Sequence, residues 1–259
     1  MNFSIHQASH IGNRKYNQDR VAYAYGKDAL LLVLADGMGG HLHGELAAGL
    51  AMDTFVESFS QYIVDPACFL TETMRAAHRR IMDLPQKSDH AFPGTTCVAA
   101  LIQDGKLYFG HAGDSRLYLM RNGRIVAKTV DHSIVQLWLQ SGMIDEATAR
   151  THPRRNQITN CLGGVEDMFE IELGKPVVLQ SGDVVLLCSD GLYGPVLDQE
   201  LVDAFVGSPV TVALDVLIEH ALILAAGHAD NVTGLAMRWG SSEVNHDTTE
   251  VIRHILEIH

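Results

Sequence analysis

The sequence predicts an α+β fold in which two mostly antiparallel sheets pack on each other and helices cover their outer faces. Two observations support this prediction. Short strand-like segments are joined by tight turns, which is typical of antiparallel hairpins. The segments with helical periodicity come in pairs, before and after the hairpins, so each sheet has two helices to cover it. A doubly wound parallel sheet would instead need a helix at nearly every crossover.

The expected strands are short and rich in apolar residues, and turn residues separate them. They cover residues 3–9, 21–25, 29–35, 94–102, 106–111, 115–120, 124–130, 175–179, 183–188 and 232–239. The run at 29–35 is apolar at every position, which indicates a strand that is buried on both faces. Two hairpins are expected, with tight turns at Gln103-Asp104-Gly105 and Arg121-Asn122-Gly123.

The expected helices are segments in which apolar residues recur every three or four positions. They cover residues 45–62, 68–84, 134–140, 145–150, 198–206 and 210–226. In the first of them, Leu46, Leu50, Phe55 and Phe59 fall roughly on one face. The last residues, 248–258, have the pattern of a terminal amphipathic helix.

A single domain is expected over residues 1–259, because no stretch of the chain resembles a linker. Between residues 131 and 164 the strand pattern stops. Such a long insertion between strands indicates a functional or mobile segment. A C-terminal tail is expected over about 241–259.

Composition excludes several classes of protein. The formal net charge of −12 argues against binding to nucleic acid or to an anionic membrane surface. The four cysteines are far apart, which is typical of isolated thiols in a reducing compartment. The N-terminal residues do not resemble a secretion signal, and no apolar run is long enough to cross a membrane. We therefore expect a soluble, cytoplasmic protein.

Five aspartates lie at strand ends or in glycine-containing turns: Asp19, Asp36, Asp114, Asp190 and Asp230. One such element would be an ordinary turn with a capping aspartate. Several of them suggest that strands deliver carboxylates to one shared edge, where they cannot all stay ionised without cations. Carboxylate, carbonyl and water ligands select hard ions such as Mg²⁺ or Mn²⁺. The histidines and cysteines lack the spacing of zinc ligands.

Seven motifs follow one another over residues 9 to 239. They are Gly12-x-Arg14-x-x-Asn17-Gln18-Asp19, Ala35-Asp36-Gly37-Met38-Gly39-Gly40-His41, Gly94-Thr95-Thr96, Gly110-His111-Ala112-Gly113-Asp114-Ser115-Arg116, Asp131-His132-Ser133, Ser189-Asp190-Gly191-Leu192 and Asp230-Asn231. In this order they resemble the metal-dependent Ser/Thr protein phosphatases of the PPM type, also called the protein phosphatase 2C family, in their compact bacterial form. The resemblance implies a four-layer α/β/β/α sandwich, in agreement with the layers predicted above. It also implies that residues 131–164 form the family's flap, which varies among members and lies beside the active site.

The resemblance implies a metal site by matching position. Asp36 would bridge two ions, with the Gly37 carbonyl as a further ligand. Asp190 and Asp230 would hold the first ion, and Asp114, together with Asp190, would contribute to a third, weaker ion. The implied cofactor is Mg²⁺ or Mn²⁺, two to three ions per chain. Water activated between two ions about 3.5–4 Å apart would attack phosphorus in line, without a covalent phosphoenzyme.

The resemblance assigns the substrate phosphate to Arg14, since a guanidinium offers phosphate oxygens a planar pair of donors. Two departures from the family pattern are visible. Gln18 stands where many members have Glu; it is a possible ligand without charge, and Asp19 could share its task. Met38 stands where eukaryotic relatives have a histidine that is a candidate general acid, as is usual in the bacterial branch. His41 is an open substitute.

Other motif residues have plainer expected roles. Thr95 and Thr96 are expected at a strand start, and arrangement of the site is an open alternative. His111 is expected to be packed or hydrogen-bonded rather than a metal ligand, and Cys188 to lie in the core.

The implied function is metal-dependent hydrolysis of phosphoserine and phosphothreonine in proteins, opposing a bacterial Ser/Thr kinase in signalling. The partners would be that kinase and its phosphorylated targets, the protein would be a monomer, and the flap would select substrates. Two alternatives stay open. The first is a catalytically weak or inactive sensor or scaffold with the same fold, which only Gln18 favours. The second is a metal-dependent hydrolase of small phosphoesters.

Overall fold

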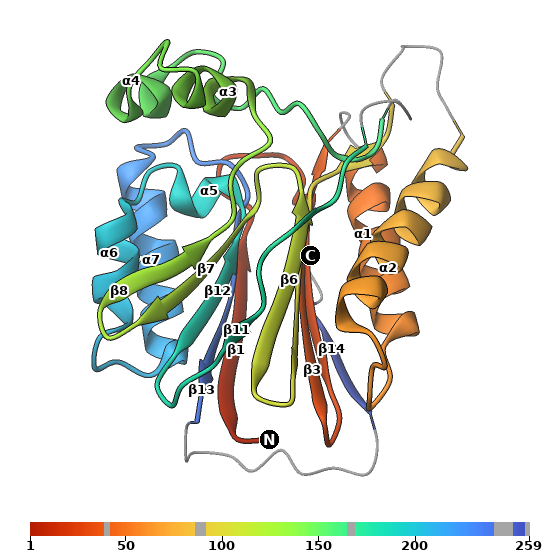
Figure 1. Ribbon diagram of the computed structural model, residues 1–259. Coiled ribbons are helices and arrows are strands. Elements are labelled where there is room, and N and C mark those ends of the chain that lie inside the picture. The colour runs from red at the N-terminus through yellow and green to blue at the C-terminus, as the bar shows by residue number, and fades with distance from the viewer. Residues whose placement is uncertain (39–41, 86–91, 165–168, 241–250, 257–259) are drawn as a thin grey trace.

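The computed structural model describes residues 1–38, 42–85, 92–164, 169–240 and 251–256. Two sheets stand side by side in the middle of the molecule, and a pair of helices covers the outer face of each (Figure 1). The predicted α/β/β/α sandwich is confirmed. None of the described helices is long and apolar enough to cross a membrane.

The first sheet has five strands, and every neighbouring pair is antiparallel. In spatial order they are β1 (Phe3–His10), β13 (Val232–Trp239), β12 (Val184–Cys188), β7 (Arg116–Arg121) and β8 (Arg124–Lys128).

The second sheet is larger. Its main path runs through β10 (Glu172–Leu173), β6 (Lys106–Ala112), β5 (Cys97–Gln103), β3 (Ala29–Met38), β2 (Asp19–Tyr25) and β14 (Ile252–Ile255). Three two-residue strands extend it: β11 (Val177–Val178) beside β6, β4 (Gly94–Thr95) beside β3, and β9 (Leu162–Gly163) beside β4.

The helices divide between the two sheets. α1 (Leu42–Ser58) and α2 (Pro66–Met82) cover the second sheet, whereas α6 (Asp198–Phe205) and α7 (Val210–Leu224) cover the first (Figure 1). The single-turn helix α5 (Asp190–Tyr193) follows β12 directly. The flap helices α3 (Ile134–Gln140) and α4 (Glu146–Thr151) lie apart from the layers, above the first sheet in Figure 1.

The apolar run of β3 explains the layers. Leu30, Leu32 and Leu34 point into the core between the sheets, while Leu31 and Val33 point toward α1 and α2. All five side chains are fully buried, and alternation along a strand sends successive residues to opposite faces. A third cluster lies between the first sheet and its helices α6 and α7. A strand that is apolar at every position is therefore the central strand of this sandwich.

Both predicted tight turns are present. Asp104 and Gly105 have φ angles of 51° and 66°, and Asn122 and Gly123 have 50° and 71°. Left-handed conformations at both central residues match the twist of a two-residue hairpin, and Asn, Asp and Gly tolerate them best.

One residue of the predicted apolar face and one predicted helix were wrong. Leu46 is exposed on α1, where the buried face is built from small residues such as Ala47, Ala48 and Ala51. The predicted C-terminal helix is absent from the described part of the tail, which instead forms β14 along the free edge of β2. There His254 stacks on Tyr23 with ring centroids 4.5 Å apart. Pairing with the free edge of β2 stabilises this segment, whereas a short helix without tertiary packing is only marginally stable in water.

Candidate metal centre

The predicted carboxylates meet at one end of the sandwich, between the two sheets. Asp19 at the start of β2 is the direct cross-strand partner of Asp36 near the end of β3. Directly opposed residues of an antiparallel pair point to the same face, here the face between the sheets. β12 ends beside them at Cys188, immediately before Asp190, and β13 begins immediately after Asp230 and Asn231.

Asp19 is fully buried. Its Oδ2 accepts a hydrogen bond of 2.8 Å from the Ser189 hydroxyl, but its Oδ1 has no partner among the described residues. Burial raises the pKa of Asp19 to about 7, against hydrogen bonds from Thr233 and Ser189 that lower it, and Asp190 adds to the rise. A buried carboxylate oxygen without a partner is costly, so this atom calls for a cation or a bound donor.

Threonines hold the backbone on both sides of Asp36. The Asp36 N–H donates to the Thr96 hydroxyl at 3.0 Å, and the Thr96 N–H donates to the Asp36 carbonyl at 2.8 Å. The Thr95 hydroxyl donates to the same carbonyl at 2.9 Å. The two threonines therefore hold the backbone of Asp36 in place, which favours the open alternative. Burial, followed by the charges of Asp19 and Asp190, raises the pKa of Asp36 well above its usual range.

Gly37 is confined on both sides. Its N–H donates to the Gln18 carbonyl at 3.2 Å, and a methyl group at its Cα would overlap the carbonyl of Gly44 in α1. Gln18 lies against the same helix, because a methyl group at Gly44 would collide with the Gln18 side-chain nitrogen. Met38 is half-buried at the end of β3. His41 lies outside the described residues.

Asp114 and Asp190 complete the carboxylate group. Asp114 follows β6 and is buried; burial, with the charges of Asp190 and Asp131, raises its pKa well above the usual range. Asp190 is the first residue of α5, and burial and Asp230 raise its pKa to about 6, with Arg14 acting in the opposite direction. Four carboxylates with raised pKa values in one place are the electrostatic signature of a cation site.

Arg14 and Asp230 bind each other. Arg14 Nη2 donates to Asp230 Oδ2 at 2.6 Å, while 60% of the Arg14 side chain stays exposed. The loop before β2 is tied to the same place, because Asn13 N–H donates to the Ala229 carbonyl at 2.9 Å. Asn231 adds a further tie by accepting from the Gln18 N–H at 2.8 Å.

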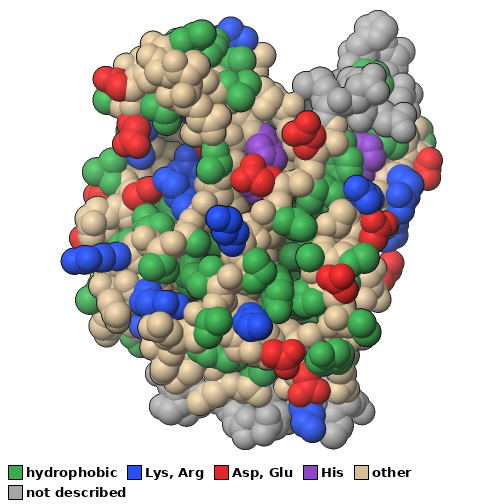
Figure 2. Space-filling view, viewed as in Figure 1, with side chains coloured by type: hydrophobic (Ala, Val, Ile, Leu, Met, Phe, Trp, Pro, Cys, Tyr) green, Lys and Arg blue, Asp and Glu red, His purple; other side chains and the backbone are tan. Residues whose placement is uncertain are grey.

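A cleft of about 830 Å³ runs from Asp114, Asp190 and Asp230 beneath the flap toward α5 and α6. Arg14, Asp114, Asp190 and Asp230 line it, together with Arg155 from the flap. Basic and acidic side chains lie side by side beneath α3 and α4 (Figure 2). A charged ligand that enters this cleft meets both the carboxylates and exposed guanidinium groups.

The residues present fit hard divalent cations. The donor set is oxygen-rich, anionic and partly without partners, which suits Mg²⁺ or Mn²⁺ better than softer metals. Sequence reasoning brought these carboxylates together but missed two residues beside them. Ser189 lies within a noted motif, and only the fold shows that its hydroxyl reaches Asp19. Arg155 carried no signal in the sequence.

Three comparisons with known proteins bear on this site. Residues 6–216 match the family model described as protein phosphatase 2C. Protein phosphatase PhpP of Streptococcus pneumoniae is 31% identical over 226 residues, which cover 85% of this chain and 90% of that protein. Serine/threonine protein phosphatase PstP of Mycobacterium tuberculosis is 36% identical over 222 residues, which cover 85% of this chain but 41% of that longer protein.

Solved structures give the same result. The serine/threonine phosphatase of S. agalactiae superimposes with a TM-score of 0.83 at 27% identity, over 92% of this chain and 99% of that chain. The catalytic domain of the serine threonine protein phosphatase PstP, in complex with two manganese ions, superimposes with a TM-score of 0.77 at 32% identity, over 91% of this chain and 97% of that chain.

Proposed function

The chain belongs to the protein phosphatase 2C family, and on this basis we propose that its carboxylate site hydrolyses phosphoserine and phosphothreonine in proteins. It is a protein-serine/threonine phosphatase of the compact bacterial kind. The observation that carries the proposal is the meeting of Asp19, Asp36, Asp114 and Asp190, with raised pKa values, beside the exposed Arg14.

We propose the metal ligands by position in the family's motifs, and the clustering of the carboxylates supports them. Asp36 would bridge two ions with help from the Gly37 carbonyl, and Asp190 and Asp230 would complete the first. Asp114 would join Asp190 at a third, weaker ion. Asp19, whose Oδ1 lacks a described partner, and Gln18 are candidates for the second. We propose Mg²⁺ or Mn²⁺, two to three ions per chain. When bound, two such ions lower the pKa of a water molecule that they share, which supplies the nucleophile.

Arg14 would bind the phosphate. Its side chain is long, largely exposed and anchored at one nitrogen by Asp230, so its remaining N–H groups can face the cleft. In this place it would orient the phosphoryl group and stabilise the charge that grows on the phosphate oxygens during in-line attack. The hydrogen bonds from Thr95 and Thr96 would keep Asp36 in position throughout.

The flap would choose the substrate. We propose a single domain over residues 1–259, in which the segment 131–164 covers the cleft that leads to the carboxylates. We propose that it contacts the protein around the phosphorylated residue, and that the enzyme reverses the action of a Ser/Thr kinase. The scaffold alternative rested on Gln18 alone, and Asp36, Asp114, Asp190 and Asp230 all lie at the site.

The substrate class can be tested by comparing hydrolysis of a phosphothreonine peptide with that of a small aryl phosphate. We expect a higher kcat/KM for the peptide, because the cleft extends beyond the carboxylates. Replacing residues 131–164 with the corresponding segment of a relative should change the preference among peptides and leave hydrolysis of the aryl phosphate nearly unchanged. If the preference among peptides were unchanged after the exchange, the proposed role of the flap would be contradicted.

A further inference from the structure

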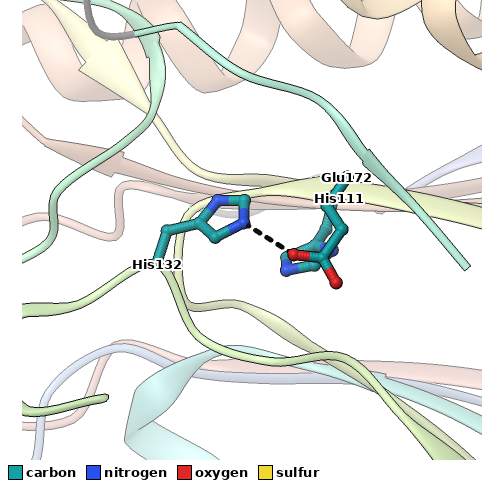
Figure 3. Close-up of side chains that lie close together, drawn as sticks. All are labelled: His111, His132 and Glu172. Carbon is teal, nitrogen blue, oxygen red and sulfur yellow. Dashed lines mark hydrogen bonds and ion pairs between the residues drawn. The ribbon is translucent and has the colours of Figure 1, made fainter. Parts of the chain in front are cut away.

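A second polar cluster lies beside the root of the flap. His111 in β6, His132 and Glu172 in β10 each bring a nitrogen or oxygen atom to within 4.8 Å of the others (Figure 3). Two histidines and a carboxylate are a common ligand set for Zn²⁺. Whether the cluster is a metal site depends on where the ring protons are.

Asn160 determines which ring nitrogen of His132 is the acceptor. Its amide orientation is set by Glu170, whose N–H donates to Asn160 Oδ1 at 2.9 Å and whose carbonyl accepts from Nδ2 at 2.8 Å. The same Nδ2 donates to His132 Nδ1 at 2.8 Å, and the Gly113 N–H donates to that nitrogen at 3.2 Å. Nδ1 is therefore an acceptor, so the proton of the neutral ring is on Nε2, 3.3 Å from Glu172 Oε2.

The ring of His111 also has a fixed hydrogen-bond partner. Its Nε2 donates to the Val130 carbonyl at 2.7 Å. The rings of His111 and His132 stack with centroids 4.5 Å apart and planes 22° apart. Because nitrogen lone pairs lie in the ring plane, two stacked rings do not direct them at one ion. A metal-binding histidine would also donate from its second nitrogen, whereas His132 accepts there. The cluster is thus a hydrogen-bond centre and not a metal site.

His132 makes hydrogen bonds with both backbone polar groups of Gly113. The His132 N–H donates to the Gly113 carbonyl at 3.0 Å, while His132 Nδ1 accepts from the Gly113 N–H. Asp114 is the next residue. The His132 carbonyl accepts from the Thr159 N–H at 2.8 Å, and Asn160 donates to the ring. One residue therefore joins the loop that carries Asp114 to the returning arm of the flap.

The far end of the same loop is also fixed. Arg116 Nε and Nη2 donate to the two carboxylate oxygens of Asp131 at 2.7 Å each, and the guanidinium lies 3.6 Å from the centroid of the Tyr193 ring. Within the loop, the Ser115 hydroxyl lies 2.6 Å from the hydroxyl of Thr96, which accepts from the Asp36 N–H. The backbone around Asp114 is therefore held at several points, and His132 supplies the contact nearest to it on the N-terminal side.

We propose that His132 is a positioning residue that acts through Gly113 to hold the Asp114 carboxylate at its ion. The inference rests on the proposed function, in which Asp114 is a ligand of the third, weaker ion. Loss of the acceptor at Nδ1 leaves the Gly113 N–H without this partner and removes one of the contacts that hold the loop. The ion at Asp114 should then bind more weakly, while the two ions assigned to Asp36 are held as before.

Two variants distinguish the roles of the two ring nitrogens of His132. In His132→Asn the side-chain oxygen takes the place of Nδ1 as acceptor. In His132→Gln the polar group lies one bond further out and the acceptor beside Gly113 is lost. Calorimetric titration with Mn²⁺ should show the weakest site about tenfold weaker in His132→Gln, and within about twofold of wild type in His132→Asn. Glu172→Gln serves as the control, because it alters the contact at Nε2 and leaves the acceptor at Nδ1 in place.

A double-mutant cycle with Asp114→Asn tests whether His132 acts through Asp114. Asp114→Asn should abolish the weakest site, and adding His132→Gln should change Mn²⁺ binding no further. Wild-type binding in His132→Gln, or a loss that adds to that of Asp114→Asn, would overturn the proposal. If circular dichroism shows His132→Gln unfolded, Asn160→Ala takes its place. A weaker site is expected, because the His132 ring loses the contact that orients it, and wild-type binding is the contrary result. Failure of the proposed function would look different, since the wild-type chain would then bind Mn²⁺ without hydrolysing a phosphopeptide.

Discussion

Asp19 and Asp36 face each other across the ladder between β2 and β3, with their side chains on the face between the sheets. Burial and then the like charge of Asp19 raise the pKa of Asp36 well above its usual range. Folding without a cation therefore brings together groups that repel one another near neutral pH. A divalent ion held by these carboxylates, as proposed above, would offset this repulsion, so metal binding and folding should be strongly linked.

The stability of the metal-free protein should fall as pH rises. The pKa values of Asp19 and Asp190 are raised to about 7 and about 6, so the folded chain binds protons more tightly than the unfolded chain. Their contribution is fully present below about pH 4 and is lost as pH rises through the folded values; the loss is on the order of a few kcal/mol.

Thermal denaturation in EDTA at pH 5, 6, 7 and 8 checks this prediction. We expect Tm to fall across the series, a smaller fall in Asp19→Asn, and a larger Tm gain from Mn²⁺ at pH 8 than at pH 5. Asp28→Asn, an exposed position, should follow the wild type. A flat or rising Tm in EDTA would contradict the linkage.

Replacing Arg14 with alanine should separate phosphate binding from metal binding. We expect kcat/KM for a phosphopeptide to fall on the order of 100-fold, since a donor to the phosphate is lost. Mn²⁺ affinity should stay the same or increase, because Asp230 loses a competing cation. Calorimetry and steady-state kinetics on the same preparation measure both quantities. Arg75→Ala, at an exposed ion pair on α2, is the control; a parallel loss of Mn²⁺ affinity in Arg14→Ala would contradict the assignment.

Gln18→Glu should strengthen the metal site at the expense of the metal-free fold. The new carboxylate adds a charged ligand next to Asp19 and near Asp36, which favours cations but increases repulsion without them. Tm should fall in EDTA at pH 7.5 and gain more from Mg²⁺ than the wild type does. Gln180→Glu provides an exposed comparison. If Mg²⁺ raised the Tm of Gln18→Glu by no more than that of the wild type, Gln18 would lie outside the ligand set.

Gly12 tests how closely the Arg14 loop packs on Asp230. It has a φ angle of 64°, and a methyl group on it would collide with the Asp230 carbonyl. Gly12→Ala should therefore cost at least about 2 kcal/mol of unfolding free energy in urea denaturation and reduce activity. Gly105→Ala is a matched control, since its φ of 66° is nearly the same and a methyl group there meets open space. It should cost only about 1 kcal/mol, and equal losses would mean that backbone strain alone matters.

Local patterns were enough to predict the layers of this fold. The apolar run of β3 and the two tight turns have short-range physical causes, so a single sequence reveals them. β14 could not be predicted in this way, because its partner β2 lies more than 200 residues away and pairs with it only in the folded chain. Leu46 was misplaced because Ala47, Ala48 and Ala51 form a closely packed face that hydrophobicity alone underrates.

In the candidate site, too, locally encoded features were predictable and long-range contacts were not. Asp36 and Asp190 were recognisable because each ends an apolar strand beside glycine. The contacts that arrange them were not, because Ser189 reaches Asp19 across 170 positions of sequence and Asn160 reaches His132 across 28. Such contacts depend on strand register and on the path of the flap, which local spacing does not encode.

The most direct measurement is dephosphorylation of a phosphothreonine peptide with Mn²⁺, with Mg²⁺ and with EDTA, by the wild type, Asp36→Asn and Asp190→Asn, with Asp28→Asn as the control. We expect activity with either metal, none in EDTA, and a loss of at least about 100-fold in both site variants at unchanged folding. Full activity in EDTA, or in either site variant, would contradict a phosphatase whose nucleophile is activated by metal ions at these carboxylates.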